Sequence, residues 1–132
     1  MIAPAPRLSP TDVVLAQLEG LRDEPLDGVG AGPGIIRAWE FASPANREAT
    51  GPVDRFADMV RSGVHRVLLQ HRAAQLGPLL EDAGEAQQEV LVLTADDRTV
   101  GFTWVLSLQD DPLHAGCWMT DGVLRHPDRT AS

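Results

Sequence analysis

The sequence predicts an α+β domain in which helices come first and a curved, mainly antiparallel four-stranded sheet follows. Three observations support this fold class. The first half of the chain carries apolar residues at helical spacing between strong capping residues, and the second half alternates apolar and polar residues with a period of two. The length of 132 residues and the apolar share of 43% fit a single core between two layers. A curved sheet that wraps one long helix would leave a conical cavity with an open mouth.

The first helix is predicted to run from Ser9 to Arg22. Ser9 is placed to cap the free backbone N–H groups, Pro10 suits the first helical position, and Asp12 lies near the positive end of the helix dipole. An apolar stripe with spacing i, i+4 and i+7 follows: Val14, Leu18 and Leu21. This helix opens the domain.

The next segment, 23–34, holds four glycines and two prolines and is predicted to be a flexible connection. It does not follow a strand, so it is not a phosphate-binding loop. A second helix is expected over 35–42. Ser43 then caps a new helical turn that Gly51 closes, and a further helix begins at Pro52.

Four strands are predicted in the second half of the chain. One lies within 70–80 and bends at the Gly77-Pro78 pair, and the others cover 87–94, 100–108 and 117–125. The third of these has the clearest alternation in the chain. Polar turn residues separate the strands.

The domain is expected to span 9–125. Residues 1–8 are interrupted by prolines and are predicted to form an irregular arm. Residues 126–132 are predicted to form a flexible tail, and His126 is set aside with it.

Charge and composition narrow the possible partners and the compartment. The chain has 19 acidic residues against 11 basic ones, all arginine, and a net charge of −8. Such a surface repels phosphate backbones, which argues against a nucleic-acid partner. The acidic excess favours a halophilic, archaeal source with a salt-rich cytoplasm. No apolar run approaches the roughly 20 residues of a membrane span, and no signal-peptide pattern is present, so a cytoplasmic location without membrane association is expected.

No cofactor and no metal site are expected. The pairs Asp96-Asp97 and Asp110-Asp111 lack the ligand spacing of a calcium loop and belong to turns. Cys117 is the single cysteine, which excludes an internal disulfide and a zinc site with paired thiolates. It is expected to be a small buried apolar residue.

Several motifs follow one another in a specific order: Ser9 to Leu21, Phe41 to Arg47, Gly51 with Phe56 and Met59-Val60, and Trp118-Met-Thr-Asp-Gly-Val123. Together they resemble a family of small proteins of unknown function in the cystatin-like, or nuclear-transport-factor-2-like, superfamily. The resemblance covers roughly 9–125 and implies helices in the concave face of a bent sheet. It implies no activity. The sequence departs from the family pattern at His65 and Met119, where the family often has tyrosine and arginine.

A pocket of this shape can run acid–base chemistry when it holds a group with a shifted pKa. The superfamily includes ketosteroid isomerase, whose arrangement uses tyrosine; this chain has none. A dehydratase-like site needs a His–Asp pair, for which His65, His71 and His114 are candidates. The first two are expected near the junction of helices and sheet. The alternative is that backbone groups satisfy them there.

Asp121 is the third weak catalytic candidate beside His65 and His71. Regular alternation on the last strand places it on an apolar face with Cys117, Met119 and Val123. A carboxylate there is costly unless it is partnered. It either pairs with a helix terminus or Arg47, which is structural, or lines the cavity, which is functional.

Six large apolar residues are candidates for binding a flat hydrophobic ligand: Trp39, Phe56, Met59, Phe102, Trp104 and Trp118. The same set is also what the core of such a domain requires. Trp39 and Trp104 are expected to be the exceptions to core packing, because tryptophan is seldom fully buried.

Three functional hypotheses follow. The first is a non-catalytic module that binds a small apolar ligand or a partner, as a homodimer joined through the outer sheet face at Val105 and the outward residues of 90–93. The second is a small cofactor-free isomerase or lyase that uses a His–Asp pair. The third is a protein whose surface serves assembly alone.

Overall fold

Helices precede every strand in the computed structural model, which describes residues 3–128. The helices are α1 (Pro10–Arg22), α2 (Pro33–Glu40), α3 (Pro44–Thr50) and α4 (Val53–Ser62), followed by the short 3-10 helix η1 (Val64–Leu68). The strands are β1 (Ala73–Asp82), β2 (Glu85–Leu93), β3 (Thr99–Leu108) and β4 (Trp118–Arg125). The α+β prediction is confirmed.

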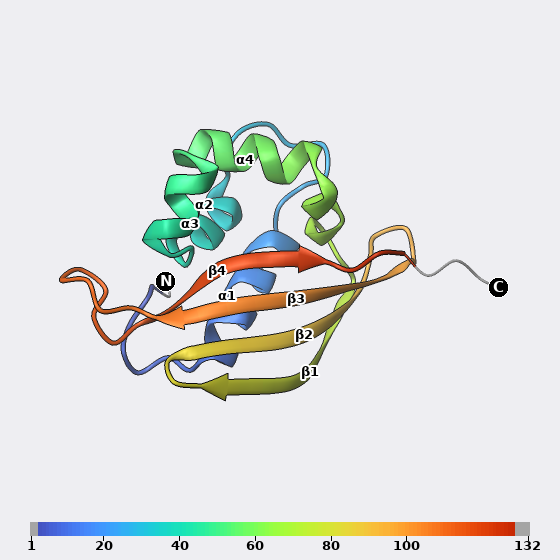
Figure 1. Cartoon of the computed structure of the whole chain (residues 1–132). Coiled ribbons are helices and arrows are strands. Elements are labelled where there is room, and N and C mark those ends of the chain that lie inside the picture. The colour runs from blue at the N-terminus through green and yellow to red at the C-terminus, as the bar shows by residue number, and fades with distance from the viewer. Residues whose placement is uncertain (1–2, 129–132) are drawn as a thin grey trace.

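The four strands form one open antiparallel sheet in the order β1-β2-β3-β4. Helix α1 runs across one face of the sheet, and α2, α3 and α4 gather beyond its β4 edge (Figure 1). Side chains alternate between exposed and buried along β2 up to its last residue, Leu93, which is half-buried. The register of β1 shifts between Leu76 and Leu79, which confirms the bend predicted at Gly77-Pro78.

Local capping explains where the helices begin. Ser9 Oγ accepts from the Asp12 backbone N–H at 3.1 Å, and Asp12 Oδ2 accepts from the Ser9 N–H at 2.9 Å, a reciprocal capping box. Ser43 Oγ likewise accepts from the Asn46 N–H at 3.2 Å, and Gly51 closes α3 with φ of 84°. The predicted boundaries of these two helices are confirmed.

The glycine-rich connection is held more firmly than the sequence predicts, and α2 begins at Pro33 rather than at residue 35. Glu24 Oε1 accepts from the backbone N–H groups of Gly34 and Ile35, at 2.7 and 3.2 Å. Glu24 Oε2 lies 3.2 Å from Arg61 Nη2. A buried carboxylate therefore caps α2 from outside the helix and fixes the end of the connection that leads into α2.

Arg61 of α4 makes further hydrogen bonds, and we call Glu24, Arg61 and their backbone partners the clamp. Arg61 Nε donates to the Gly30 carbonyl at 2.8 Å and its Nη1 to the Pro25 carbonyl at 2.9 Å. The side chains of Arg61 and Glu24 are only 11% and 5% exposed. The ion pair thus ties α4, the connection and the start of α2 together.

The described residues of both predicted chain ends make contacts with the rest of the domain. Leu8 is 5% exposed and packs in the core, so the arm is irregular but not free. The His126 backbone N–H donates to the Gly101 carbonyl at 2.9 Å. Its Nε2 lies 2.7 Å from Thr103 Oγ1 and 3.1 Å from Glu89 Oε2. Both segments contact residues that are distant in the sequence. Residues 1–2 of the predicted arm and 129–132 of the predicted tail lie outside the residues that the structure describes.

Helices α1 and α2 cross with two glycines in contact. A Cβ added at Gly34 would lie 1.9 Å from the Gly20 carbonyl oxygen, and one added at Gly20 would lie 2.7 Å from the Gly34 carbonyl oxygen. The backbones are therefore too close for any side chain at this crossing.

We expect Gly34→Ala to lower the free energy of unfolding by about 3 kcal/mol, because the two helices must move apart to admit the methyl group. Urea denaturation measures this change. Gly122→Ala is the matched control, since a Cβ at Gly122 meets no atom within 4 Å. Equal stability of the two variants would show that the crossing tolerates a side chain.

Candidate functional site

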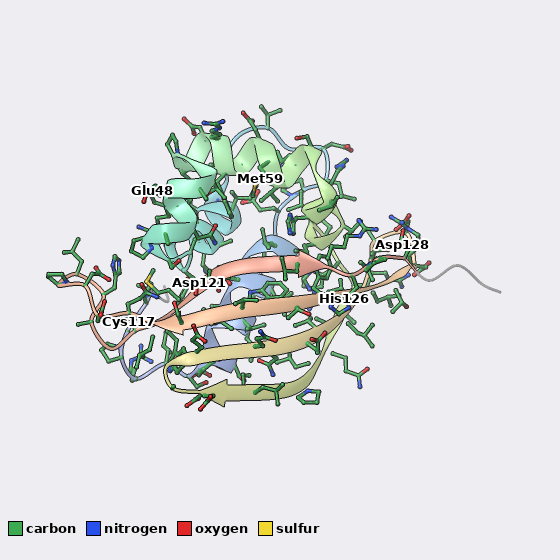
Figure 2. All side chains as sticks on the ribbon, viewed as in Figure 1. Glu48, Met59, Cys117, Asp121, His126 and Asp128 are labelled. Carbon is green, nitrogen blue, oxygen red and sulfur yellow. The ribbon has the colours of Figure 1, made fainter. Side chains whose placement is uncertain are left out.

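A cavity of about 240 Å³ lies between the helical layer and the edge strand β4. Helices α1 and α2 contribute to it along with α3, α4, η1 and β3. Trp104 and Thr120 line it from the sheet and are 0% and 1% exposed. Met59 lines it from α4, is 37% exposed, and marks the solvent side (Figure 2).

The cavity is uncharged. Among the described residues, every lining side chain is apolar or neutral. The side chains with hydrogen-bonding atoms are Gln17, Asn46, Thr50, His65, Trp104 and Thr120. Such a cavity favours neutral, largely apolar molecules, because a bound charge would lose its hydration without an opposite charge to replace it.

Gln17 joins four elements at the inner wall. Its Oε1 accepts from Trp104 Nε1 at 2.8 Å and from Thr120 Oγ1 at 2.6 Å. Its Nε2 donates to the Ala38 carbonyl at 2.9 Å. Gln17 is 5% exposed, so one buried amide satisfies polar groups of α2, β3 and β4 from α1.

His65 lines the cavity but has a backbone partner. Its Nε2 lies 2.6 Å from the Val123 carbonyl oxygen. Because a carbonyl only accepts, Nε2 carries a proton, and in that neutral tautomer Nδ1 would be an acceptor. The ring stacks against Phe102 with centroids 6.2 Å apart.

His71 is away from the cavity lining. It is 4% exposed, and its Nδ1 lies 2.7 Å from the Leu68 carbonyl oxygen. Burial lowers the pKa of this imidazole, the hydrogen bond to Leu68 opposes the shift, and the charge of Arg22 lowers the pKa further. The ring is a packed junction histidine.

The expected His–Asp pair is not found at the cavity. Within residues 3–128, no carboxylate lies within hydrogen-bonding distance of His65 or His71. His114 does meet a carboxylate, with Nδ1 2.9 Å from Asp111 Oδ2. Both belong to the loop between β3 and β4, and this hydrogen bond lowers the pKa of Asp111. That loop does not line the cavity.

Asp121 is exposed, so the predicted apolar surroundings are wrong. Leu106 pairs with Thr120 and Val105 with Gly122, which leaves Asp121 as the extra residue of a β-bulge. The bulge breaks the alternation that places Asp121 beside Met119, which is itself fully buried. A solvated carboxylate needs no partner, and neither alternative proposed for Asp121 holds.

Arg47, the suggested partner of Asp121, serves α2 instead. Its Nε donates to the Trp39 carbonyl at 3.1 Å and its Nη2 to the Glu40 carbonyl at 2.6 Å. The guanidinium carbon lies 4.3 Å from the Trp39 ring centroid. A cation at the end of α2 also interacts favourably with the helix dipole.

The six apolar candidates divide between cavity and core. Phe56, Met59 and Trp104 line the cavity. Phe102 is fully buried in the core, and Trp39 and Trp118 pack partly buried against it without lining the cavity. Trp104 is completely buried, contrary to the expectation, because Gln17 satisfies its indole N–H.

Sequence reasoning missed the polar lining on α3. Asn46 Nδ2 donates to the Thr120 carbonyl at 3.1 Å, and Thr50 Oγ1 donates to the Asn46 carbonyl at 3.0 Å. Asn46 is the single asparagine of the chain and lies four residues before Thr50, so both share one helix face. That spacing was a usable signal once α3 was predicted.

Two further features concern residues 3–128, the part of the chain that the structure describes. No group of three or more His, Cys, Asp or Glu side chains there is arranged to hold a metal ion. No helix in the same part of the chain has the length and apolar character to cross a membrane.

Comparisons with known proteins identify a family. Neither the curated proteins nor the solved structures provide a match to this chain. A family model described as domain of unknown function DUF4864 matches residues 10–131, almost the whole chain. The chain therefore belongs to the family of the DUF4864 domain of unknown function.

Proposed function

We propose that the protein binds a small, neutral, largely apolar ligand in the cavity between the helical layer and β4, without a chemical step. The observation that carries this proposal is an uncharged cavity of about 240 Å³ with its inner wall held in place by Gln17. This volume is slightly below the roughly 300–1,000 Å³ of sites for drug-sized ligands. A ligand of one or two rings suits it.

The isomerase or lyase alternative is the weaker of the two proposals. It requires a histidine paired with a carboxylate at the cavity, and in the described residues His65 and His71 are paired with backbone carbonyls. Their partners hold the rings in place and supply no base.

We also propose that the fold is that of the cystatin-like, or nuclear-transport-factor-2-like, superfamily. The order of helices before an open antiparallel sheet, with a cavity between the two layers, supports this. The homodimer through the outer sheet face and the cytoplasmic location stay predictions.

Blocking the cavity mouth tests the proposed function. We expect Met59→Trp to weaken the binding of naphthalene at least tenfold, because the indole narrows the entrance while its partly exposed position limits strain in the fold. Equilibrium dialysis of naphthalene and chemical-shift changes of the backbone amides measure the affinity.

Leu113→Trp is the matched control, because Leu113 is 88% exposed in the loop between β3 and β4 and does not line the cavity. This variant should bind naphthalene like the unmodified protein. Undetectable binding to the unmodified protein, or equal binding by all three proteins, would contradict the proposed site.

A further inference from the structure

Some hydrogen-bonding atoms of the cavity lining already have partners in the protein, and others do not. Asn46 donates to the Thr120 carbonyl through Nδ2, which fixes the orientation of its amide. No hydrogen bond to Asn46 Oδ1 is formed within residues 3–128. The amide oxygen therefore keeps its capacity to accept.

Thr50 also keeps the capacity to accept a hydrogen bond. Its single hydroxyl proton is donated to the Asn46 carbonyl at 3.0 Å, so only the lone pairs of Oγ1 remain for another group. Because Asn46 and Thr50 are one helical turn apart on α3, their acceptor atoms lie on the same side of the cavity.

His65 adds an acceptor from η1. The Val123 carbonyl at 2.6 Å uses the Nε2 proton, and Nδ1 of the neutral ring can only accept. Against these acceptors the lining keeps two amide N–H donors, one on Gln17 Nε2 and one on Asn46 Nδ2, while the Gln17 oxygen already accepts two hydrogen bonds. The polar capacity left in the lining is mainly that of an acceptor.

From this imbalance we infer that the ligand is a neutral molecule with an apolar body and at least one hydrogen-bond donor, such as a phenol or an alcohol. The inference rests on the proposed binding function and narrows it to one ligand class. A hydroxyl donor can pair with Asn46 Oδ1, Thr50 Oγ1 or His65 Nδ1, which belong to half-buried side chains of the lining. A carboxylate is excluded, because it brings only acceptors and a charge that no lining arginine balances.

A matched ligand series tests the inference on the intact protein. The probes are 2-naphthol, naphthalene and 2-naphthoate, which share one ring system and differ in the group that they present. We expect 2-naphthol to bind at least tenfold more tightly than naphthalene, and 2-naphthoate to bind more weakly than both. Equilibrium dialysis at neutral pH measures the three affinities.

The outcomes separate this inference from the function on which it rests. Equal affinity for 2-naphthol and naphthalene, or tighter binding of 2-naphthoate, overturns the ligand class while a binding cavity remains. Absence of binding by all three probes overturns the proposed function itself.

Thr50→Val assigns the acceptor, because it keeps the shape of the side chain and removes its oxygen. The advantage of 2-naphthol over naphthalene should shrink in this variant and in His65→Phe. It should persist in Thr99→Val, whose exposed residue on β3 lies outside the cavity. If the affinity ratio of 2-naphthol to naphthalene is unchanged in both cavity variants, the assignment to these side chains is overturned. The ligand series measured on the unmodified protein does not depend on whether a variant folds.

Discussion

Replacing Glu24 with alanine is expected to lower the free energy of unfolding by about 3–5 kcal/mol. The substitution leaves the Arg61 guanidinium, whose side chain is only 11% exposed, without its carboxylate. It also leaves the backbone N–H groups of Gly34 and Ile35 at the start of α2 without an acceptor. Both losses act on buried groups, which is why the effect is large.

Urea denaturation of Glu24→Ala, with the midpoint and the slope fitted separately, checks this value. Asp27→Ala is the control, because Asp27 makes an ion pair with Arg66 at 3.8 Å while fully exposed; an exposed pair contributes about 0–1 kcal/mol. Glu24→Gln separates the two losses, since the amide oxygen still accepts from α2. A similar small effect of all three variants would contradict the clamp.

Gln17→Leu is expected to lower the free energy of unfolding by about 3 kcal/mol. The substitution removes the partners of the Trp104 indole N–H, the Thr120 hydroxyl and the Ala38 carbonyl in one step. Each buried polar group left without a partner costs about 1–3 kcal/mol, partly offset here by the gain of an apolar side chain and by local relaxation.

Gln88→Leu is the matched control for this prediction. Gln88 is a second buried glutamine, and it has two recorded partners, the Thr11 hydroxyl and the Gly77 carbonyl. Gln88→Leu should therefore lower the free energy of unfolding by less than Gln17→Leu does. Adding Trp104→Phe to Gln17→Leu should recover part of the lost stability, because the unpaired indole N–H is removed. If the effects of the two substitutions on the free energy of unfolding were fully additive, the hydrogen bond between Gln17 and Trp104 would not be supported.

The elements that depend on local chemistry were predictable. Ser9 and Ser43 cap helices through residues three positions away, and Gly51 ends α3 with a positive φ that favours glycine. The bend of β1 at Gly77-Pro78 follows from the properties of those two residues alone. In each case the partner lies within one turn of chain.

The candidate site was predicted only in part. Phe56, Met59 and Trp104 line the cavity, whereas similar side chains at Trp39, Phe102 and Trp118 do not. Hydrophobicity favours burial for all six and does not distinguish a cavity wall from a packed core. That distinction depends on where α3 and α4 lie relative to β4.

Asp121 shows how one tertiary feature reverses a sequence argument. Regular alternation places its side chain on the apolar face, and the bulge opposite Val105 and Leu106 moves it into solvent. The bulge is located where Ala42 pairs with Thr120 on the other edge of β4. The residues of a strand do not by themselves show which segments pair with its two edges.

By itself, the sequence determined the α+β order, the helix caps, the strand alternation and the turns, because each arises from residues that are neighbours along the chain. Only the tertiary structure decided that Glu24 clamps Arg61 and α2, that Gln17 joins four elements, and that His126 is bound to the outer face of the sheet. These side chains are polar and find their partners at distances of 10 to 103 residues along the chain. No local preference encodes such a pairing; it follows from the burial of polar atoms that must be satisfied once the layers have packed.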